Sequence, residues 1–203
     1  MTSKTERSGT EAPRNPQRRQ WFVPASRPRT SSAIPDVPVV THDGRTVRFY
    51  TDLVRGRVVF INMMYAQCSN QCPPTTQNLR RVHQALGPRV GKDIFMYSIS
   101  LLPEYDTPAD LRGYMREQRV GPNWTFLTGR KQDIERIRRG LGFSDPDPKL
   151  DADITRHTSM VRIGNDALDR WTMTPSMVEA DWILECLMSV DPVTRAGGRI
   201  HAV

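Results

Sequence analysis

The chain has 203 residues, among them 29 Lys or Arg and 22 Asp or Glu, so its formal net charge is +7. This length suits one domain that can bury a substantial core. No run of 18 or more apolar residues is present, which excludes a transmembrane helix encoded here. The N-terminal part also lacks the apolar segment typical of a secretory signal peptide.

The positive charge is concentrated at the N-terminus. Residues 1–33 hold seven basic and two acidic side chains, a net of +5, whereas the remaining residues have a net of +2. This lead is rich in Arg, Pro, Ser and Thr without an apolar period, which indicates disorder. We therefore expect a disordered lead over 1–33, one domain over 34–192 and a flexible tail over 193–203.

Two arginine-containing segments, "NLRRVHQ" and "IERIRRG", lie within the expected domain. Their basic residues are mixed with apolar ones at helical spacing, which is typical of a solvated helix face. We therefore do not expect a nucleic-acid partner, because such a partner requires Lys and Arg to cluster on one folded surface.

The first half of the domain shows a hairpin, a buried strand and a helix. Alternating residues around Asp43-Gly44 in "VPVVTHDGRTVRFYTDL" predict the hairpin. The apolar run "RVVFINMMY" (57–65) predicts a strand covered on both faces. The segment "PPTTQNLRRVHQALG" predicts a helix that starts at Pro73 and stops at Gly87.

The middle of the chain repeats the order of strand and helix. "DIFMYSISL" reads as a strand, and the next helix has Thr107 as N-cap, Pro108 at its first position and Asp110 at its third. "WTFLTG" predicts a short strand and "RKQDIERIRRGLG" a helix whose inward side chains are Ile134, Ile137 and Leu141.

The C-terminal part predicts a long loop, an antiparallel strand pair and a closing helix. The loop is "FSDPDPKLDADITR", the strands are "HTSMVRIGN" and "LDRWTM" with a turn at 164–166, and the helix is "PSMVEADWILECLMSV". Strands that alternate with helices and end in a hairpin and a helix indicate an α/β domain. We expect a mixed sheet flanked by helices, with an N-terminal β-hairpin.

Cys68 and Cys72 stand between the buried strand and the helix that starts with prolines. A thiol at a helix N-terminus lies at the positive end of the helix dipole, which favours the thiolate and lowers its pKa. A thiolate is both a nucleophile and a soft ligand for Cu(I) or Zn(II). The three-residue spacing is compatible with a metal site, a disulfide or two buried free cysteines, and leaves all three open.

A two-sulfur copper site requires a further donor, and the four histidines are the candidates. His42 in the hairpin turn and His201 in the tail are interpreted as solvated. His83 is eleven residues beyond Cys72, about 16 Å along a helix axis, which is too far to share an ion. His157 begins a strand after the long loop and is the candidate third ligand. Three other sulfur-bearing residues are interpreted as packing residues: Met63, Met64 and Cys186.

Four segments together resemble the Sco/SenC family of copper-binding, thioredoxin-like assembly factors. They are "YAQCSNQCPP" for its C-x-x-x-C-P motif, "SISLLPEYDTPADLRGY", "WTFLTG" and "HTSMV". The resemblance extends from about Val37 to Asp191. One difference is Leu102, which stands where many members carry an acidic residue in an S-V-D-P segment.

The resemblance implies a thioredoxin-like fold and a copper ion held by Cys68, Cys72 and His157. The implied function is to deliver copper to, or reduce the cysteines of, the dinuclear copper centre of cytochrome c oxidase. Its partners would be a copper-receiving protein such as an oxidase subunit and a reductant for the cysteine pair. The implied location is the periplasmic side of the cell envelope.

Two other functions use the same cysteines. In a thiol–disulfide oxidoreductase, Cys68 would attack and Cys72 would resolve, whereas a redox sensor would use the pair without turnover. His157 distinguishes these hypotheses, because copper binding requires it and disulfide exchange does not. We expect a metallochaperone that is not an enzyme, with oxidoreductase activity as the alternative.

Overall fold

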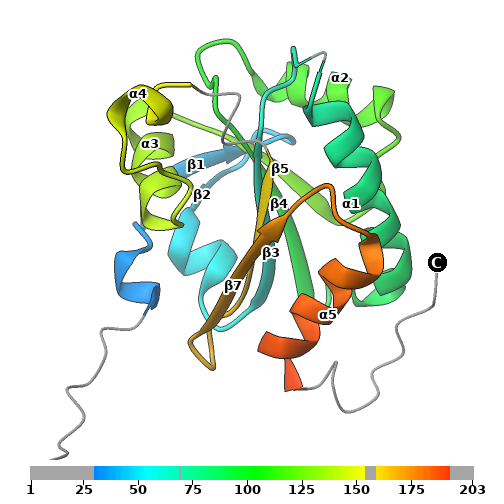
Figure 1. Ribbon diagram of the computed structural model, residues 1–203. Coiled ribbons are helices and arrows are strands. Elements are labelled where there is room, and N and C mark those ends of the chain that lie inside the picture. The colour runs from blue at the N-terminus through cyan, green and yellow to red at the C-terminus, as the bar shows by residue number, and fades with distance from the viewer. Residues whose placement is uncertain (1–29, 69, 154–158, 193–203) are drawn as a thin grey trace, which may run out of the picture.

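The computed structural model describes residues 30–68, 70–153 and 159–192. A seven-stranded mixed sheet forms the centre of the molecule and has helices on both faces (Figure 1). The strands are β1 (Pro38–Thr41), β2 (Thr46–Arg48), β3 (Val58–Met64), β4 (Ile94–Ser100), β5 (Trp124–Thr128), β6 (Met160–Asn165) and β7 (Arg170–Pro175). This architecture confirms the predicted α/β class and mixed sheet.

Helices α1, α2 and α5 cover one face of the sheet, and α3 lies on the other (Figure 1). The α-helices are α1 (Cys72–Leu86), α2 (Pro108–Glu117), α3 (Lys131–Gly140), α4 (Pro148–Asp151) and α5 (Ala180–Val190). Three shorter helical segments are η2 (Thr30–Ala33), η3 (Phe49–Val54) and η4 (Gly87–Arg89). No helix in the described part of the chain is long and apolar enough to cross a bilayer.

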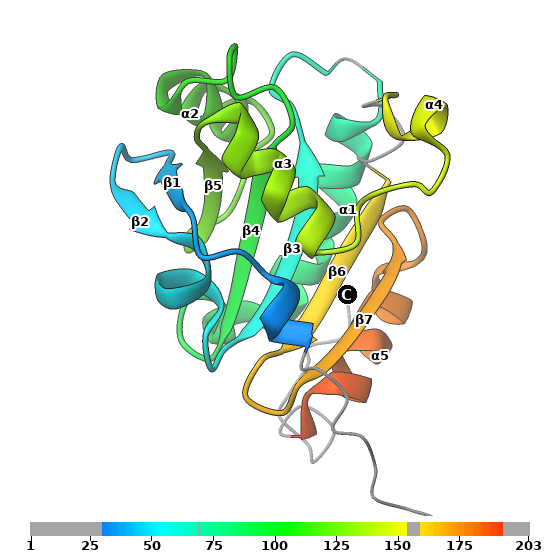
Figure 2. The same ribbon diagram turned by 90° about the vertical axis from the view of Figure 1, so that its left-hand side faces the viewer.

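The strands follow the order β2-β1-β5-β4-β3-β6-β7 across the sheet (Figure 2). β3 and β4 are parallel, with Met64 opposite Ser100, so their C-terminal ends meet at one edge. β6 runs antiparallel to β3 and pairs Val161 with Asn62 near the same edge. Loops that leave β3 and β4 therefore meet there, where α/β sheets commonly place their ligand sites.

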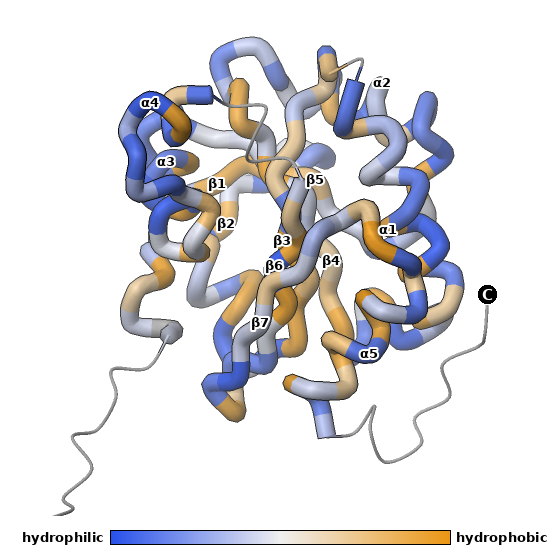
Figure 3. The backbone as a smooth tube through the Cα atoms, viewed as in Figure 1, coloured by the Kyte–Doolittle hydropathy of each residue, from blue (hydrophilic) through white to orange (hydrophobic). Residues whose placement is uncertain are grey.

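Two apolar layers hold the helices on the sheet. The central strands are strongly apolar (Figure 3), and the last six residues of β3 are all buried. Phe60 of β3 faces the α1 and α5 layer, whereas Ile61 faces α3 and η3. Burial on both faces explains the continuous apolar run and confirms the strand predicted from it.

The start of α2 and the end of α1 agree with the predicted signals, whereas the closing helix was predicted from Pro175 and begins only at Ala180, because β7 extends to Pro175. The side chain of Thr107 accepts a hydrogen bond from the amide of Asp110 at 3.3 Å, and the Asp110 carboxylate accepts one from the amide of Thr107 at 2.9 Å. These two bonds form the predicted capping box of α2. Helix α1 ends at Gly87, whose φ of 53° is accessible to glycine without steric cost.

Three local predictions were wrong. Residues 49–54 form the helical segment η3 instead of extending the hairpin, because Phe49, Leu53 and Val54 are buried together on one side. The β6–β7 turn follows Asn165, which still pairs with Val58 in β3. The predicted loop over 143–156 contains α4, whose first turn is capped by the Asp147 side chain at 2.9 Å from the Lys149 amide.

The last residues of the expected lead contact the folded domain. The short helix η2 is held to the β6–β7 turn by a 2.9 Å hydrogen bond from the amide of Thr30 to the carboxylate of Asp169. Residues 1–29 and 193–203, which contain most of the expected lead and the whole expected tail, lie outside the described residues.

Gly164 is required where β6 passes under an aromatic ring. A Cβ atom there would lie 2.1 Å from Cε3 of Trp171, whereas a Cβ on Gly113 in α2 would meet no atom within 4 Å. We expect Gly164→Ala to lower the free energy of unfolding by about 1–3 kcal/mol through overpacking. Gly113→Ala, the control, should raise it by up to about 1 kcal/mol through helix propensity. Urea unfolding checks both; equal effects would contradict this packing.

Candidate metal centre

Cys68 and Cys72 lie at the edge of the sheet where β3 and β4 end. Cys68 is in the loop after β3, and Cys72 is the first residue of α1. Their exposed fractions are 6% and 1%, and both belong to the apolar cluster that contains Met64 and Leu79. The structure therefore brings the two predicted cysteines together at the upper end of the core.

The start of α1 directs a backbone donor at the first sulfur. The amide of Cys72 donates a hydrogen bond to Sγ of Cys68 at 3.3 Å, and both cysteines are free thiols. The first amides of a helix have no partner within the helix. Pro73 and Pro74 have no amide hydrogen, so the amide of Cys72 is the donor that this turn offers.

Cys68 is the more acidic thiol. Burial opposes its ionisation, but hydrogen bonds from the Cys72 thiol, the Tyr65 hydroxyl and the amides of Cys72 and Asn70 outweigh this cost. They lower the pKa of Cys68 to about 7. A substantial fraction of Cys68 is therefore thiolate at neutral pH, the form that attacks disulfides and binds soft metal ions.

The pKa of Cys72 is raised, contrary to the expectation from its place at a helix N-terminus. Burial is the main cause, and the hydrogen bond that its thiol donates to Cys68 adds to it. The dipole at the start of α1 does not compensate, because the apolar surroundings penalise a second negative charge beside the first. In the reduced protein one proton is thus shared between two sulfurs.

Tyr65 is a site residue that sequence reasoning missed. Its hydroxyl donates a hydrogen bond to Cys68, which together with burial raises the pKa of Tyr65 to about 12. The residue stands three positions before Cys68, and its backbone also accepts a hydrogen bond from the Cys68 amide at 3.2 Å. Its closeness in the sequence was a usable signal, but its orientation was not predictable.

Asp106 is a second missed residue and connects the loops that follow β3 and β4. Its carboxylate is 1% exposed and accepts hydrogen bonds from the amide of Ala66 at 3.1 Å and the hydroxyl of Ser100 at 2.6 Å. Burial raises the pKa of Asp106, although both hydrogen bonds oppose the shift. The carboxyl group anchors the cysteine loop two residues before Cys68.

Leu102, where the sequence departs from the family pattern, helps to form the turn beside this anchor. Its amide donates to Ser100 Oγ at 3.0 Å, and its carbonyl accepts from the amides of Tyr105 and Asp106, each at 2.9 Å. The side chain is half-buried. These hydrogen bonds involve only the backbone of Leu102. A leucine and an acidic residue can therefore form them equally well.

The predicted third ligand, His157, lies outside the described residues, as does His201. His42 is half-buried and not solvated as expected, because its Nδ1 accepts a 3.2 Å hydrogen bond from the amide of Phe126. Burial lowers the pKa of His42. His83 bonds the carbonyl of Pro122 at 2.8 Å and stacks on Trp124, a structural position away from the cysteines.

The other sulfur-bearing residues pack as expected. Met63 and Met64 are buried on opposite faces of the sheet, and Cys186 is half-buried against the α1 and α5 layer. Among residues 30–68, 70–153 and 159–192, no group of three or more His, Cys, Asp and Glu side chains is placed to hold a metal ion. Two adjacent thiols in an apolar setting still fit a soft ion such as Cu(I), which needs few ligands of this kind.

The two thiols should react with iodoacetamide at different pH values. Because the pKa of Cys68 is lowered to about 7, its alkylation rate should rise through pH 7 and level off above pH 8. Cys72 should stay protonated and react slowly over this range. Cys72→Ala removes a thiol donor and should move the Cys68 midpoint to higher pH. Mass spectrometry of the alkylated peptides measures both; a shared midpoint near pH 9 would contradict the assigned asymmetry.

Comparison with known proteins finds relatives in sequence and in fold. A Stutzerimonas stutzeri protein described as copper-binding is 27% identical over 110 residues, 54% of this chain and 52% of that protein. The chain thus matches about half the length of this curated relative. The SCO1/SenC family lipoprotein of Bacillus anthracis superposes with a TM-score of 0.63 at 20% identity, over 77% of this chain and 94% of that one.

Two further solved structures share the fold. BsSco, described as having a disulfide switch and as a member of a family of cytochrome c oxidase assembly proteins, has a TM-score of 0.60 at 23% identity, covering 77% of this chain and 92% of that one. Yeast Sco1 with copper bound has a TM-score of 0.57 at 17% identity, covering 78% of this chain and 96% of that one. The SCO1/SenC family model itself matches residues 29–189. Because that match takes in most of the chain, the protein belongs to the SCO1/SenC family.

Proposed function

We propose that the protein is a metallochaperone that binds one Cu(I) ion through Cys68, Cys72 and His157. The observation that carries this proposal is the contact between the two cysteines, with the Cys72 amide 3.3 Å from Sγ of Cys68. One loop thus presents two soft donors in an apolar, nearly water-free setting. Such donors select Cu(I) over harder ions.

The course of the chain supports His157 as the third ligand. β6 begins at Met160, beside the end of β3, and the cysteine loop leaves from that end. His157 precedes Met160 by three residues, a distance that an extended chain spans within about 10 Å. A neutral imidazole would add one donor without adding charge to the two thiolates.

The recipient and the location follow from the relatives. Members of the family are described as cytochrome c oxidase assembly proteins, and we propose that this chain delivers copper to an oxidase subunit. One relative is described as a lipoprotein, which supports a location at the cell envelope, on the periplasmic side. The cysteine pair would then need a reductant there before each loading step.

A second function is favoured by the unequal pKa values of the cysteines. In a thiol–disulfide exchange, the Cys68 thiolate attacks a partner disulfide and releases one partner thiolate. Cys72 then loses its proton and attacks Cys68, which releases the second partner thiolate and leaves a Cys68–Cys72 disulfide. Two electrons pass to the partner in this reaction. The reaction needs a thiolate at the attacking sulfur, which the lowered pKa of Cys68 provides, and a second thiol that reacts later, as the protonated Cys72 would.

Cu(I) titration against a competing chelator tests the copper proposal. The reduced protein should bind one Cu(I), and Cys68→Ser, Cys72→Ser and His157→Ala should each weaken binding at least tenfold, because each removes one of three donors. Cys186→Ser, which removes a thiol away from the site, is the matched control and should leave the affinity unchanged.

His157→Ala also separates the two functions. If this variant bound Cu(I) with unchanged affinity, the three-ligand site would be wrong. If the wild-type protein reduced insulin disulfides at a rate comparable to thioredoxin, and His157→Ala did so equally, the oxidoreductase function would be favoured.

A further inference from the structure

Five arginines on one side of the molecule have no carboxylate partner among the described residues. They belong to α1 and to α2 with the turn that follows it: Arg80, Arg81, Arg112, Arg116 and Arg119. Arg80 is half-buried and the other four are exposed. We call this surface the α1–α2 arginine face.

Several arginines elsewhere in the fold are neutralised by neighbouring acids. On α3, Arg138 and Arg139 both pair with Glu135 and Asp151 at 2.5–3.1 Å. Helix α1 contains no acidic residue. The sequence predicted a solvated helix face for "NLRRVHQ" and did not predict that α2 and the turn after it add three arginines beside this face.

Four of the five arginines line two hollows, whereas Arg81 lines a separate one with Glu179. Arg80 of α1 and Arg119 after α2 line one hollow of about 360 Å³, together with Glu117. Arg112, Arg116 and Arg119 line a second hollow of about 300 Å³. Because Arg119 borders both, the two hollows form one continuous basic surface.

The second hollow has apolar side chains among its arginines, since Met115 and Val120 also line it. The guanidinium of Arg112 is held in place by a 2.6 Å hydrogen bond that it donates to the carbonyl of His42. A group held in this way loses little rotamer freedom when it binds a ligand. The hollow therefore fits an apolar side chain that is flanked by carboxylates.

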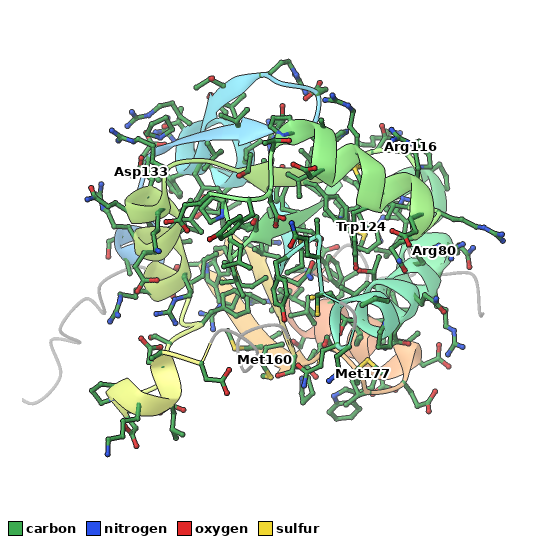
Figure 4. All side chains as sticks on the ribbon, turned by 90° about the horizontal axis from the view of Figure 1, so that it is seen from above. Arg80, Arg116, Trp124, Asp133, Met160 and Met177 are labelled. Carbon is green, nitrogen blue, oxygen red and sulfur yellow. The ribbon has the colours of Figure 1, made fainter. Side chains whose placement is uncertain are left out.

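The face shares helix α1 with Cys72. Arg80 and Arg116 lie on the same side of the molecule when it is seen from the site edge (Figure 4). Arg80 is eight residues beyond Cys72 on α1, about 12 Å along the helix axis.

We propose that the α1–α2 arginine face docks an acidic protein segment that carries an apolar residue among its carboxylates. Arginine offers paired donors that match a carboxylate group. Each exposed contact is weak by itself, so specificity depends on several pairs and on the apolar side chain in the 300 Å³ hollow. The proposal goes beyond copper binding and does not require the metal.

An extended polyanion fits this face less well. Helix α5 packs beside α1 and presents three exposed acidic residues, Glu179, Asp181 and Glu185. Glu117 also lines the hollow between Arg80 and Arg119. These carboxylates repel the broad negative surface of a membrane or a nucleic acid, whereas a short segment can follow the arginines between them.

A fluorescein-labelled 12-residue peptide of Glu and Asp with one central Phe is the probe, and anisotropy measures its binding to the full chain. We expect the Arg80→Glu, Arg116→Glu, Arg119→Glu triple variant to weaken binding more than tenfold. Raising NaCl from 50 to 300 mM should also weaken it severalfold, and replacing the central Phe by Ser should weaken it at least threefold. The triple variant with Gln at the same three positions should have an affinity between those of wild type and the Glu variant. A graded loss with charge distinguishes weakened binding from misfolding.

The matched control carries the same charge change elsewhere, as Arg55→Glu, Arg136→Glu and Arg170→Glu, and should bind within twofold of wild type. Equal loss in both triple variants, or no effect of the Phe replacement, would overturn the proposal. So would tighter binding of anionic lipid vesicles or a 12-nucleotide single-stranded DNA than of the peptide. The Cys68→Ser, Cys72→Ser variant should bind the peptide normally, so failure of the copper site remains a separate result.

Discussion

The hydrogen bond from the Cys72 amide to the sulfur of Cys68 is the contact on which the chemistry of the site depends. It exists because α1 begins at Cys72 and the next two residues have no amide hydrogen. It holds the sulfur of Cys68 against the backbone of Cys72 and stabilises a negative charge on that sulfur. The same contact serves both copper binding and disulfide exchange, since each requires a thiolate beside a second sulfur.

A buried carboxyl group keeps this contact in place. The Asp106 carboxylate accepts hydrogen bonds from the amide of Ala66 and the hydroxyl of Ser100. It thereby joins the end of β4 to the cysteine loop after β3. Removing a buried acceptor of this kind leaves donors without a partner, which costs about 1–3 kcal/mol for each. The loop that holds Cys68 is thus fixed by its own strand β3 and, through Asp106, by the end of β4, in addition to the contact between the two cysteines.

Much of this fold could be predicted because its signals are local. The apolar run over β3, the capping residues of α2 and the hairpin glycine each act within a few residues. Residues 49–54 could not be assigned, because their helical form depends on packing against the sheet. Cys68 and Cys72 were predicted as site residues from their spacing and their place before a helix. The raised pKa of Cys72 was not predicted, because it depends on burial by segments distant in the sequence. Asp106 was not predicted as a site residue, because its bond to Ala66, 40 residues earlier, has no local signal in the sequence.

The site and the α1–α2 arginine face share helix α1, which carries Cys72 at its first position and Arg80 two turns later. X-ray absorption of the protein loaded with one equivalent of Cu(I) tests the central claim, that two sulfurs and one imidazole hold the ion. The account predicts a first coordination shell of two sulfur atoms and one nitrogen, with the nitrogen lost in His157→Ala. A shell of sulfur alone that is identical in wild type and His157→Ala would contradict it.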